Sequence, residues 1–355
     1  MKKNYLKKVL ALFLALTMIL SMAACGSTEK KEEKAKAETE ATEEKQEDGK
    51  IELTDQAGRE IILEKPAETI VSCYYITTYA TIALGVDDKV VGLEKKADTR
   101  PIYSMAAPEL LEKTQVGSMK EFNVEATAQL NPDLVLMPMK LSDYAQTLTD
   151  LGINVLVVNP ESQELLEEML LLIGKACGVE KNAEKLIQYY EDQLKEIKKI
   201  TKDAEKPSVY MAGNSSYLTT APGAMYQSNL ITLAGGVNVA EELEGNYWTE
   251  ISYENLLAYN PEVIIIPCNA EYTKEDLLGD ANLADLTAVK ENKVFMMPQD
   301  IEEWDSPVPS GILGTMWLTS VLHDAEYPFE EFQKDGMEYY KEFYGFEMDQ
   351  NLIAK

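Results

Sequence analysis

The sequence predicts an α/β protein made of two Rossmann-like lobes that a single long helix joins. Residues 180–202 contain neither Gly nor Pro and place Leu186, Tyr190 and Ile197 on one face of a helix. Short apolar runs flanked by turn formers lie on both sides of this helix, as expected of buried parallel strands. At 1.5 Å per residue the helix spans roughly 30 Å, which is enough to connect two lobes.

The apolar runs recur at a nearly constant spacing. Runs that begin at residues 70, 131 and 153 have counterparts that begin at 209, 260 and 293, so the spacings are 139, 129 and 140 residues. The second run of each set opens with Asn-Pro followed by an acidic residue. This repeat favours two lobes with a ligand cleft between them over one large doubly wound sheet.

Composition excludes several classes of function. The 355 residues carry a net charge of −28, which disfavours nucleic acid as a partner because phosphates need Lys and Arg. His323 is the only histidine, so a multi-histidine zinc site is excluded, and we predict no metal site. If Cys25 is consumed by processing, three cysteines remain, and we expect them to be buried rather than paired.

The N-terminal residues predict export. Four lysines precede an apolar run over residues 9–22, and Ala23-Ala24 leads to Cys25, which is the layout of a secretory signal peptide over residues 1–25. An uncleaved anchor helix is the alternative. Residues 26–50 consist mainly of Glu, Lys, Ala and Thr without an aromatic residue, and they predict a flexible charged linker.

The remaining elements follow in order. A β-hairpin over residues 51–63 opens the N-terminal lobe, residues 51–160. A helix over 162–176 and the spine helix occupy residues 161–206, and Asn182 is a candidate cap of the spine helix. The C-terminal lobe, residues 207–355, ends in two helices, over 310–323 with Ser310 as a candidate cap, and over 329–343.

Five motifs carry a resemblance to a known family. They are residues 54–59 with Lys65-Pro66, residues 116–118 ahead of 123–125, residues 131–135, residues 248–254, and residues 288–294. In order and spacing the chain resembles the substrate-binding lipoproteins of ABC importers, in the class that serves iron-siderophores, haem and cobalamin. The resemblance covers residues 51–322 and implies two lobes joined by one long helix. It also implies acylation of Cys25 in a lipobox, although Met22 stands where Leu is commoner.

The resemblance also implies ligand and partners. The expected transported ligand is an iron chelate, haem or a corrinoid, and the expected partners are an ABC importer permease dimer with its ATPase. The resemblance further implies a monomer anchored to the membrane through Cys25, with no cofactor and no catalysed reaction. A molybdate- or tungstate-type oxyanion is the alternative ligand, and an extracellular hydrolase is the rival function, which the absence of a Gly-x-Ser-x-Gly motif disfavours.

Candidate ligand-binding residues come from two arguments. Ligands of open α/β sheets bind beyond the carboxyl ends of the strands. That rule selects Tyr74, Tyr75, Met139, Lys140, Asn214, Ser215, Tyr217, Asn269, Trp304 and Asp305. The resemblance adds Met119, Lys120 and Trp248, together with Arg100 and Tyr103 from a loop that can reach the cleft. The many aromatic residues suit a flat, aromatic ligand.

Glu125 and Glu254 form a separate pair. They are 129 residues apart, the same spacing as the Asn-Pro repeats, so matching lobes place them at matching positions. In relatives an acidic residue here on each lobe meets arginines of the permease, and we expect the same docking role. The alternative is two solvated glutamates that the dipoles of their helices stabilise.

Overall fold

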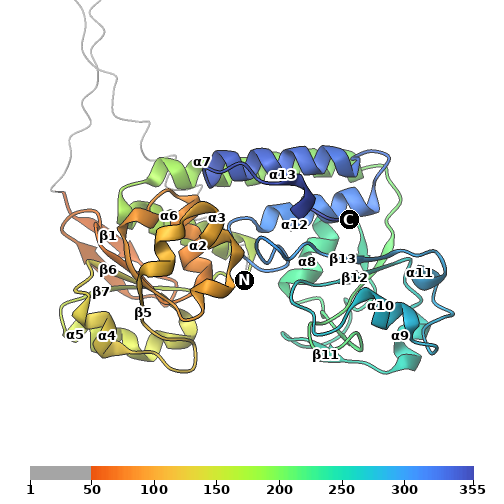
Figure 1. The fold of residues 1–355 in the computed structure, drawn as a ribbon, viewed down its shortest axis with the longest axis horizontal. Coiled ribbons are helices and arrows are strands. Elements are labelled where there is room, and N and C mark those ends of the chain that lie inside the picture. The colour runs from red at the N-terminus through yellow and green to blue at the C-terminus, as the bar shows by residue number, and fades with distance from the viewer. Residues whose placement is uncertain (1–48) are drawn as a thin grey trace, which may run out of the picture. The chain divides into compact units, whose positions relative to one another are not determined.

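The protein is described from a computed structural model that covers residues 49–355. The predicted signal peptide, Cys25 and the linker up to residue 48 lie outside the described residues. Within residues 49–355 no helix is both long and apolar enough to cross a membrane. The described residues form two α/β lobes, each built on its own parallel sheet, with long helices running along one side of both (Figure 1).

The first lobe contains a five-stranded parallel sheet of order β5-β4-β3-β6-β7. Its strands are β3 (Ile70–Ser72), β4 (Val90–Leu93), β5 (Thr114–Gln115), β6 (Leu134–Pro138) and β7 (Asn154–Val158). Its α-helices are α2 (Tyr75–Ala83), α3 (Pro101–Ala106), α4 (Val124–Gln129) and α5 (Ala145–Asp150). Short 3-10 helices are η1 (Asp87–Lys89), η2 (Ala97–Thr99), η3 (Pro108–Glu112) and η4 (Met139–Tyr144).

Both faces of this sheet are covered, which explains the continuous apolar runs. Leu134 and Leu136 of β6 join the core cluster that contains α2 and the helix after β7, whereas Val135 and Met137 join a second cluster with Leu148 of α5. A strand buried on both faces needs apolar residues at every position. The strands predicted at 70, 131 and 153 are therefore confirmed.

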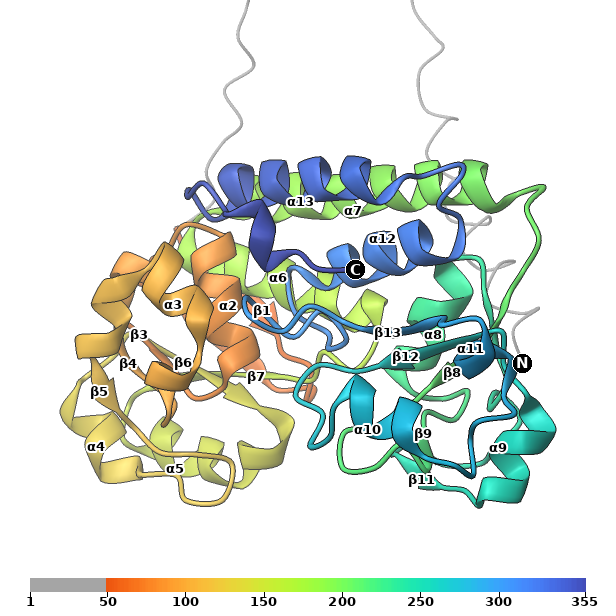
Figure 2. The same ribbon diagram turned by 45° about the vertical axis from the view of Figure 1, so that its right-hand side comes forward.

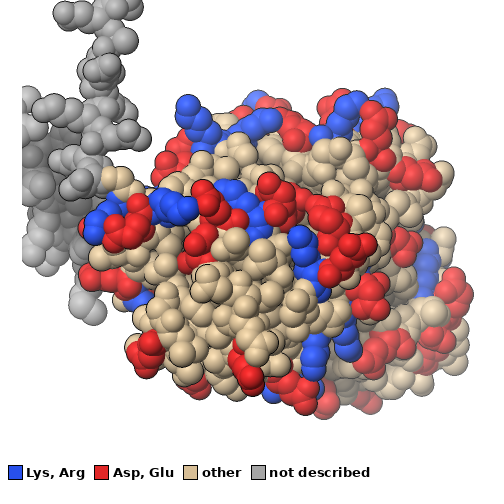
Figure 3. Space-filling model, turned by 60° about the vertical axis from the view of Figure 1, so that its left-hand side comes forward, with Lys and Arg blue, Asp and Glu red and all other residues tan. Residues whose placement is uncertain are grey.

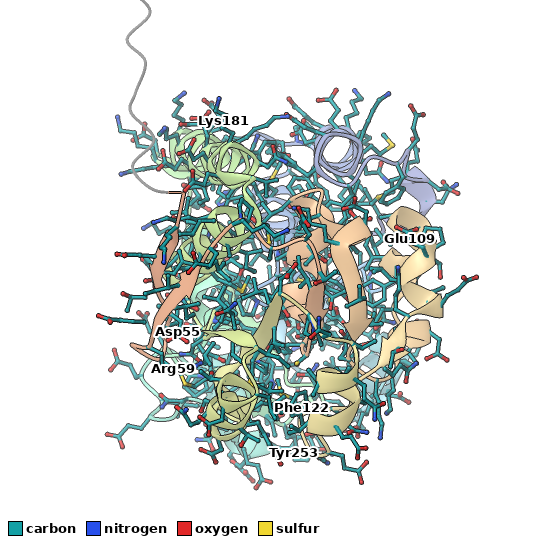
Figure 4. All side chains as sticks on the ribbon, turned by 90° about the vertical axis from the view of Figure 1, so that its left-hand side faces the viewer. Asp55, Arg59, Glu109, Phe122, Lys181 and Tyr253 are labelled. Atoms are coloured by element: carbon teal, nitrogen blue, oxygen red, sulfur yellow. The ribbon has the colours of Figure 1, made fainter. Side chains whose placement is uncertain are left out.

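The predicted hairpin is also confirmed, as β1 (Ile51–Thr54) paired antiparallel with β2 (Glu60–Leu63). The tip of the hairpin lies against the edge strand β7. Asp55 Oδ2 accepts the Val157 N–H at 3.0 Å, and the Gln56 N–H donates to the Val157 carbonyl at 3.1 Å. Arg59 lies beside Asp55 (Figure 4) and donates to the Val155 carbonyl at 3.2 Å. The hairpin thus satisfies the edge of the sheet that no strand covers.

The second lobe contains a four-stranded parallel sheet of order β10-β8-β12-β13. Its strands are β8 (Ser208–Met211), β10 (Val237–Asn238), β12 (Val263–Ile266) and β13 (Val294–Met296), and a small antiparallel pair is formed by β9 (Thr219–Thr220) and β11 (Thr249–Glu250). Its helices are α8 (Tyr226–Leu233), α9 (Tyr253–Tyr259), α10 (Lys274–Gly279) and α11 (Thr287–Lys290). The three predicted strands of this lobe are confirmed.

The predicted repeat is visible in the backbone. Asn131 and Asn260, which precede β6 and β12, both adopt positive φ values, 48° and 40°. The helices before them, α4 and α9, begin after Asn123 and Ser252, whose side chains both accept a backbone N–H of the first turn. Each pair is 129 residues apart, so the two lobes repeat one helix-turn-strand unit.

The remaining elements are α6 (Gln163–Cys177), α7 (Glu180–Thr201), α12 (Gly311–Leu322), α13 (Phe329–Phe343) and η5 (Gln350–Leu352). The spine helix is confirmed as α7, and Gly178 in the left-handed region separates it from α6. Both proposed caps are wrong. Asn182 lies inside α7 and donates to the Leu84 carbonyl at 2.8 Å, and Ser310 makes no capping hydrogen bond.

The spine is not a lone rod. Helix α13 runs beside α7 along the same side of both lobes (Figure 2). Lys185 forms an ion pair with Glu342 at 2.9 Å, and the Tyr189 ring lies 5.4 Å from the rings of Tyr339 and Phe343. Two helices therefore span the lobes where the sequence predicted one.

The outer face of the first lobe carries interspersed acidic and basic side chains around a broad uncharged area (Figure 3). Cys73, Cys177 and Cys268 are buried and free, as predicted for the cysteines of the described region.

Candidate functional site

The site begins where β3 ends, at two neighbouring tyrosines. Tyr74 is the N-cap residue of α2 and Tyr75 is its first helical residue, so Tyr75 is not in a loop as the sequence suggested. Both side chains are half-buried, and their rings meet edge to face with centroids 4.9 Å apart. The Tyr79 ring, one turn further along α2, lies 5.4 Å from that of Tyr75. The strand end thus carries a row of aromatic rings.

Arg100 links this row to the other lobe. Its guanidinium lies 3.9 Å from the centroid of the Tyr75 ring, and its Nη1 is 2.6 Å from Glu303 Oε1 in the loop after β13. The Tyr79 hydroxyl donates to Glu303 Oε2 at 2.9 Å. Asn269, which follows β12 with φ of 57°, has its amide nitrogen 3.5 Å from Glu303. A charge-assisted contact therefore joins the carboxyl-end edges of the two sheets.

The protonation states follow from burial and charge. Burial, with a contribution from Glu303 and against the opposing effect of Arg100, raises the pKa of Tyr75 to about 12. Burial also raises the pKa of Tyr79, with Glu303 adding to the effect. Burial acts to lower the pKa of Arg100, but Tyr79 and Glu303 outweigh it and the net shift is upward. At neutral pH both hydroxyls are therefore donors and Arg100 is a cation.

The buried carboxyl of Glu94 lies beside Arg100. Glu94 follows β4 and accepts hydrogen bonds from Thr78 at 2.7 Å and from Tyr103 at 2.6 Å. Burial raises the pKa of Glu94, although both hydrogen bonds oppose the shift. Tyr103 was predicted to bind ligand, and this is wrong, because its side chain is completely buried and its hydroxyl is committed to Glu94.

The loop over residues 302–305 corrects two more predictions. Trp304 is completely buried and its indole N–H donates to the Tyr340 hydroxyl at 2.8 Å, so it belongs to the core of the second lobe and does not form a cleft wall. Asp305 is 3% exposed, and burial raises its pKa to about 7 with Cys268 hydrogen bonding against the shift. Glu302 is also buried, held by Tyr340 and Tyr344. Only Glu303 of this loop reaches the first lobe.

A pocket of about 480 Å³ opens between the lobes beside this cluster. Glu161 of its lining lies near enough to Tyr74 to contribute to the raised pKa of that tyrosine, after burial and Tyr75. Pro307 of its lining follows Ser306, which lies near the Tyr75 hydroxyl. The lining residues are Asn159, Glu161, Ala224, Met225, Tyr226, Gln227, Asn246, Tyr247 and Pro307.

The sequence analysis missed this whole lining. The strand-end rule applied to β7 leads to Asn159, so that residue had a signal. The residues at the start of α8 and in the loop over 241–247 had none, because short irregular segments leave no periodic pattern.

The other predicted residues are dispersed over the two lobes. In the first lobe Met119 and Met139 pack half-buried against its core, whereas Lys120 and Lys140 are exposed. In the second lobe Ser215 is exposed, and Trp248 is half-buried beside Gly213. Asn214 donates to the Cys268 carbonyl at 2.6 Å, and Tyr217 donates to Asp280 at 2.9 Å. The hydroxyl of Tyr217 is therefore committed within its own lobe.

Among residues 49–355 no group of three or more His, Cys, Asp or Glu side chains is arranged to hold a metal ion. Two parallel-sheet lobes, helices along one side and a pocket between the lobes define a solute-binding protein.

The comparisons agree with this class. The model of the periplasmic binding protein family matches residues 70–301, so the chain belongs to that family. Its members considered below are solute-binding proteins of transport systems.

The chain is 30% identical to YvrC, an ABC transporter substrate-binding lipoprotein of Bacillus subtilis, over 84% of this chain and 91% of YvrC. It is 25% identical to the molybdate-binding protein MolA of Haemophilus influenzae, over 82% and 90% of the two chains. A periplasmic solute binding protein from Veillonella parvula has a similar structure, with a TM-score of 0.75, 25% identity, and coverage of 85% of this chain and 94% of that chain.

Proposed function

We propose that the protein captures a metal chelate, either an iron complex of a siderophore or haem or else a corrinoid, between its lobes and delivers it to an ABC importer. It is anchored outside the cell through acylated Cys25, and its partners are a permease dimer and its ATPase. Relatives whose names state iron uptake, at 27% identity, and cobalamin binding, at 24% identity, support this ligand class.

One observation carries the proposal: aromatic side chains of the first lobe face the second lobe next to a pocket lined by both. Tyr74 and Tyr75 present half-buried rings, and the exposed fraction of Tyr247 at the pocket is 83%. Large rings of this kind recognise flat or ring-bearing ligands by stacking. The pocket volume falls in the range common for small-molecule sites, which is about 300–1,000 Å³.

An oxyanion such as molybdate is the second candidate. The likeness to MolA supports it, and the exposed Lys120 and Lys140 at strand ends are available cations. The aromatic lining counts against it, because a small oxyanion needs convergent N–H donors.

Tryptophan fluorescence tests the proposal. Trp248 is half-buried, whereas Trp304 and Trp317 are fully buried, so a cleft ligand is expected to quench Trp248 preferentially. Ferric siderophores, haemin, cobalamin and molybdate are titrated into the protein and into Trp248→Phe. We expect saturable quenching by a chelate that Trp248→Phe largely loses. If nothing but molybdate quenches, the oxyanion replaces the chelate.

Docking to the permease is assigned to Glu125 and Glu254. Both are exposed in the first turns of α4 and α9, which lie on the side of the lobes opposite α7 and α13 (Figures 1 and 2). Figure 4 shows their neighbourhood, with Phe122 and Tyr253 at the end of the molecule opposite Lys181. Backbone and Ser252 hydrogen bonds lower the pKa of Glu254, so it is ionised at neutral pH. Paired carboxylates on both lobes suit bidentate contacts with arginines.

Charge reversal tests this docking role. Glu125→Lys with Glu254→Lys is expected to reduce ligand uptake at least tenfold while ligand affinity stays unchanged. Glu184→Lys with Glu338→Lys makes the same charge change on α7 and α13 and serves as the control, which is expected to retain uptake. Uptake that survives the first pair would refute the docking role.

A further inference from the structure

We propose that the inter-lobe pocket selects a chelate that carries no net negative charge, neutral or cationic, with hydrogen-bond donors on its periphery. This rests on the proposed function and narrows its ligand class. The charges and hydrogen-bonding groups of the pocket support this selectivity.

The lining of the pocket offers no cation to an anionic ligand. Among the lining residues, Glu161 is the only charged one, and the uncharged polar groups are three amides and two tyrosine hydroxyls, from Asn159, Gln227, Asn246, Tyr226 and Tyr247. The lining contains no Lys, Arg or His within the described part of the chain. An anion in this pocket would face a carboxylate and no compensating cation, which is costly when the ligand is desolvated.

The loop that forms part of the pocket lining is acidic. The loop that supplies Asn246 and Tyr247 also carries the exposed residues Glu241, Glu242 and Glu244. None of these three carboxylates has a basic partner among the described side chains. Like charges at the mouth of a cleft lower the local concentration of an anion and raise that of a cation.

Arg100 is a cation beside the pocket, in contact with the Tyr75 ring. Its charge is neutralised by Glu303 at 2.6 Å, and its guanidinium face is covered by the Tyr75 ring. Lys120 and Lys140 are not among the residues that line the pocket. Because Nη1 of Arg100 is held by Glu303 and by the Tyr79 hydroxyl, a ligand anion would compete with both for this cation.

Hydrogen bonds within the protein leave acceptors available in the pocket. Gln227 donates its amide N–H to the Asp305 carbonyl at 2.9 Å, which fixes the side chain and leaves its carbonyl oxygen as an acceptor. The Glu161 carboxylate is a second acceptor. The Asn159 N–H is held by Gln56 Oε1 at 2.6 Å, so the hairpin tip fixes this part of the wall. Two acceptors on opposite lobes fit a ligand with amide or ammonium donors.

An exposed aromatic ring also lines the pocket. Tyr247 lines the pocket and is 83% exposed, so its ring is accessible to a ligand. Its face can stack on a planar chelate or hold a cation over the ring. The second of these contacts favours a cationic ligand.

A charge-graded panel tests the inference by isothermal titration of the purified protein. The panel comprises cyanocobalamin, which is neutral; a cationic ferric trihydroxamate; haemin, which carries two carboxylates; an anionic ferric tricatecholate; and molybdate. We expect the neutral or cationic members to bind at least tenfold more tightly than every anionic member. A tricatecholate, haemin or molybdate that binds most tightly would overturn the inference while leaving the proposed solute-binding function intact. If no member binds, both fail.

Variants locate the effect in the pocket. Glu161→Gln is expected to weaken the cationic chelate about three- to tenfold and the neutral one by less than threefold, and Glu161→Lys to weaken the cationic chelate further. The control Glu184→Gln makes the same change at an exposed position of α7 and is expected to leave both affinities within twofold. Glu161→Gln that leaves the cationic chelate unaffected, or Glu184→Gln that weakens it, contradicts the assignment.

Discussion

The ion pair between Arg100 and Glu303 gives the sharpest test of how the lobes are held together. The two side chains are 22% and 21% exposed, so their charges are only partly screened. At an effective dielectric constant of about 20, two unit charges about 4 Å apart attract by about 4 kcal/mol. Desolvation of both groups offsets much of this attraction. The Tyr79 hydroxyl, 2.9 Å from Glu303, adds a hydrogen bond to the charged form. We therefore expect Glu303→Gln to lower the free energy of unfolding by about 1–3 kcal/mol.

A double-mutant cycle separates the pair from its surroundings. Arg100→Met, Glu303→Gln and the double variant are unfolded in urea, and we expect a coupling free energy of about 1–2 kcal/mol. Lys50 and Glu64 form a control pair with 52% and 75% exposure, so Glu64→Gln is expected to change stability by less than about 0.5 kcal/mol. A coupling free energy no larger than that of the control pair would show that the contact does not hold the lobes.

Three further predictions concern the core. Burial raises the pKa of Glu302 from 4.5 to about 7, so the folded protein retains a proton that the unfolded chain loses between pH 5 and 7. The free energy of unfolding is therefore expected to fall by up to about 3 kcal/mol as the pH rises through this range. In Glu302→Gln, the free energy of unfolding measured with urea should depend less steeply on pH. Trp304→Ala is expected to cost about 3–5 kcal/mol; Trp248→Ala should cost less than half as much, and near-equal losses by thermal denaturation would contradict the different burial of the two rings. Asp55→Ala removes the acceptor of three backbone N–H groups and is expected to cost about 2–3 kcal/mol by the same assay, whereas an unchanged stability would show that the hairpin tip is held by other contacts.

The spine helix and the strands could be predicted from the sequence because local patterns of apolar residues determine them. The spine helix has a single apolar stripe, and the central strands β6 and β12 are apolar at every position because both faces of each sheet are covered. The repeat of 129 residues was readable for the same reason, since Asn131 and Asn260 both have to adopt positive φ.

The site was less predictable because long-range contacts decide it. Trp304 follows a strand end, as a ligand-binding residue does, but its partner Tyr340 comes 36 residues later on α13. Tyr103 was placed in the core by Glu94 in the same way. No local pattern records which hydroxyl will meet a buried carboxylate or indole. Arg100 was predicted to reach the cleft, and it forms an ion pair with Glu303 that the sequence did not reveal.

The tyrosines of α13 have a consequence for the order of assembly. Tyr339 donates to the Pro309 carbonyl, as does Tyr190 of α7, and Tyr340 and Tyr344 hold Glu302. The loop that carries Glu303 is thus anchored by side chains close to the end of the chain. A polypeptide that emerges N-terminal end first can complete both sheets before this loop is fixed. The loop that carries Glu303 is therefore fixed only once α13 has packed against it.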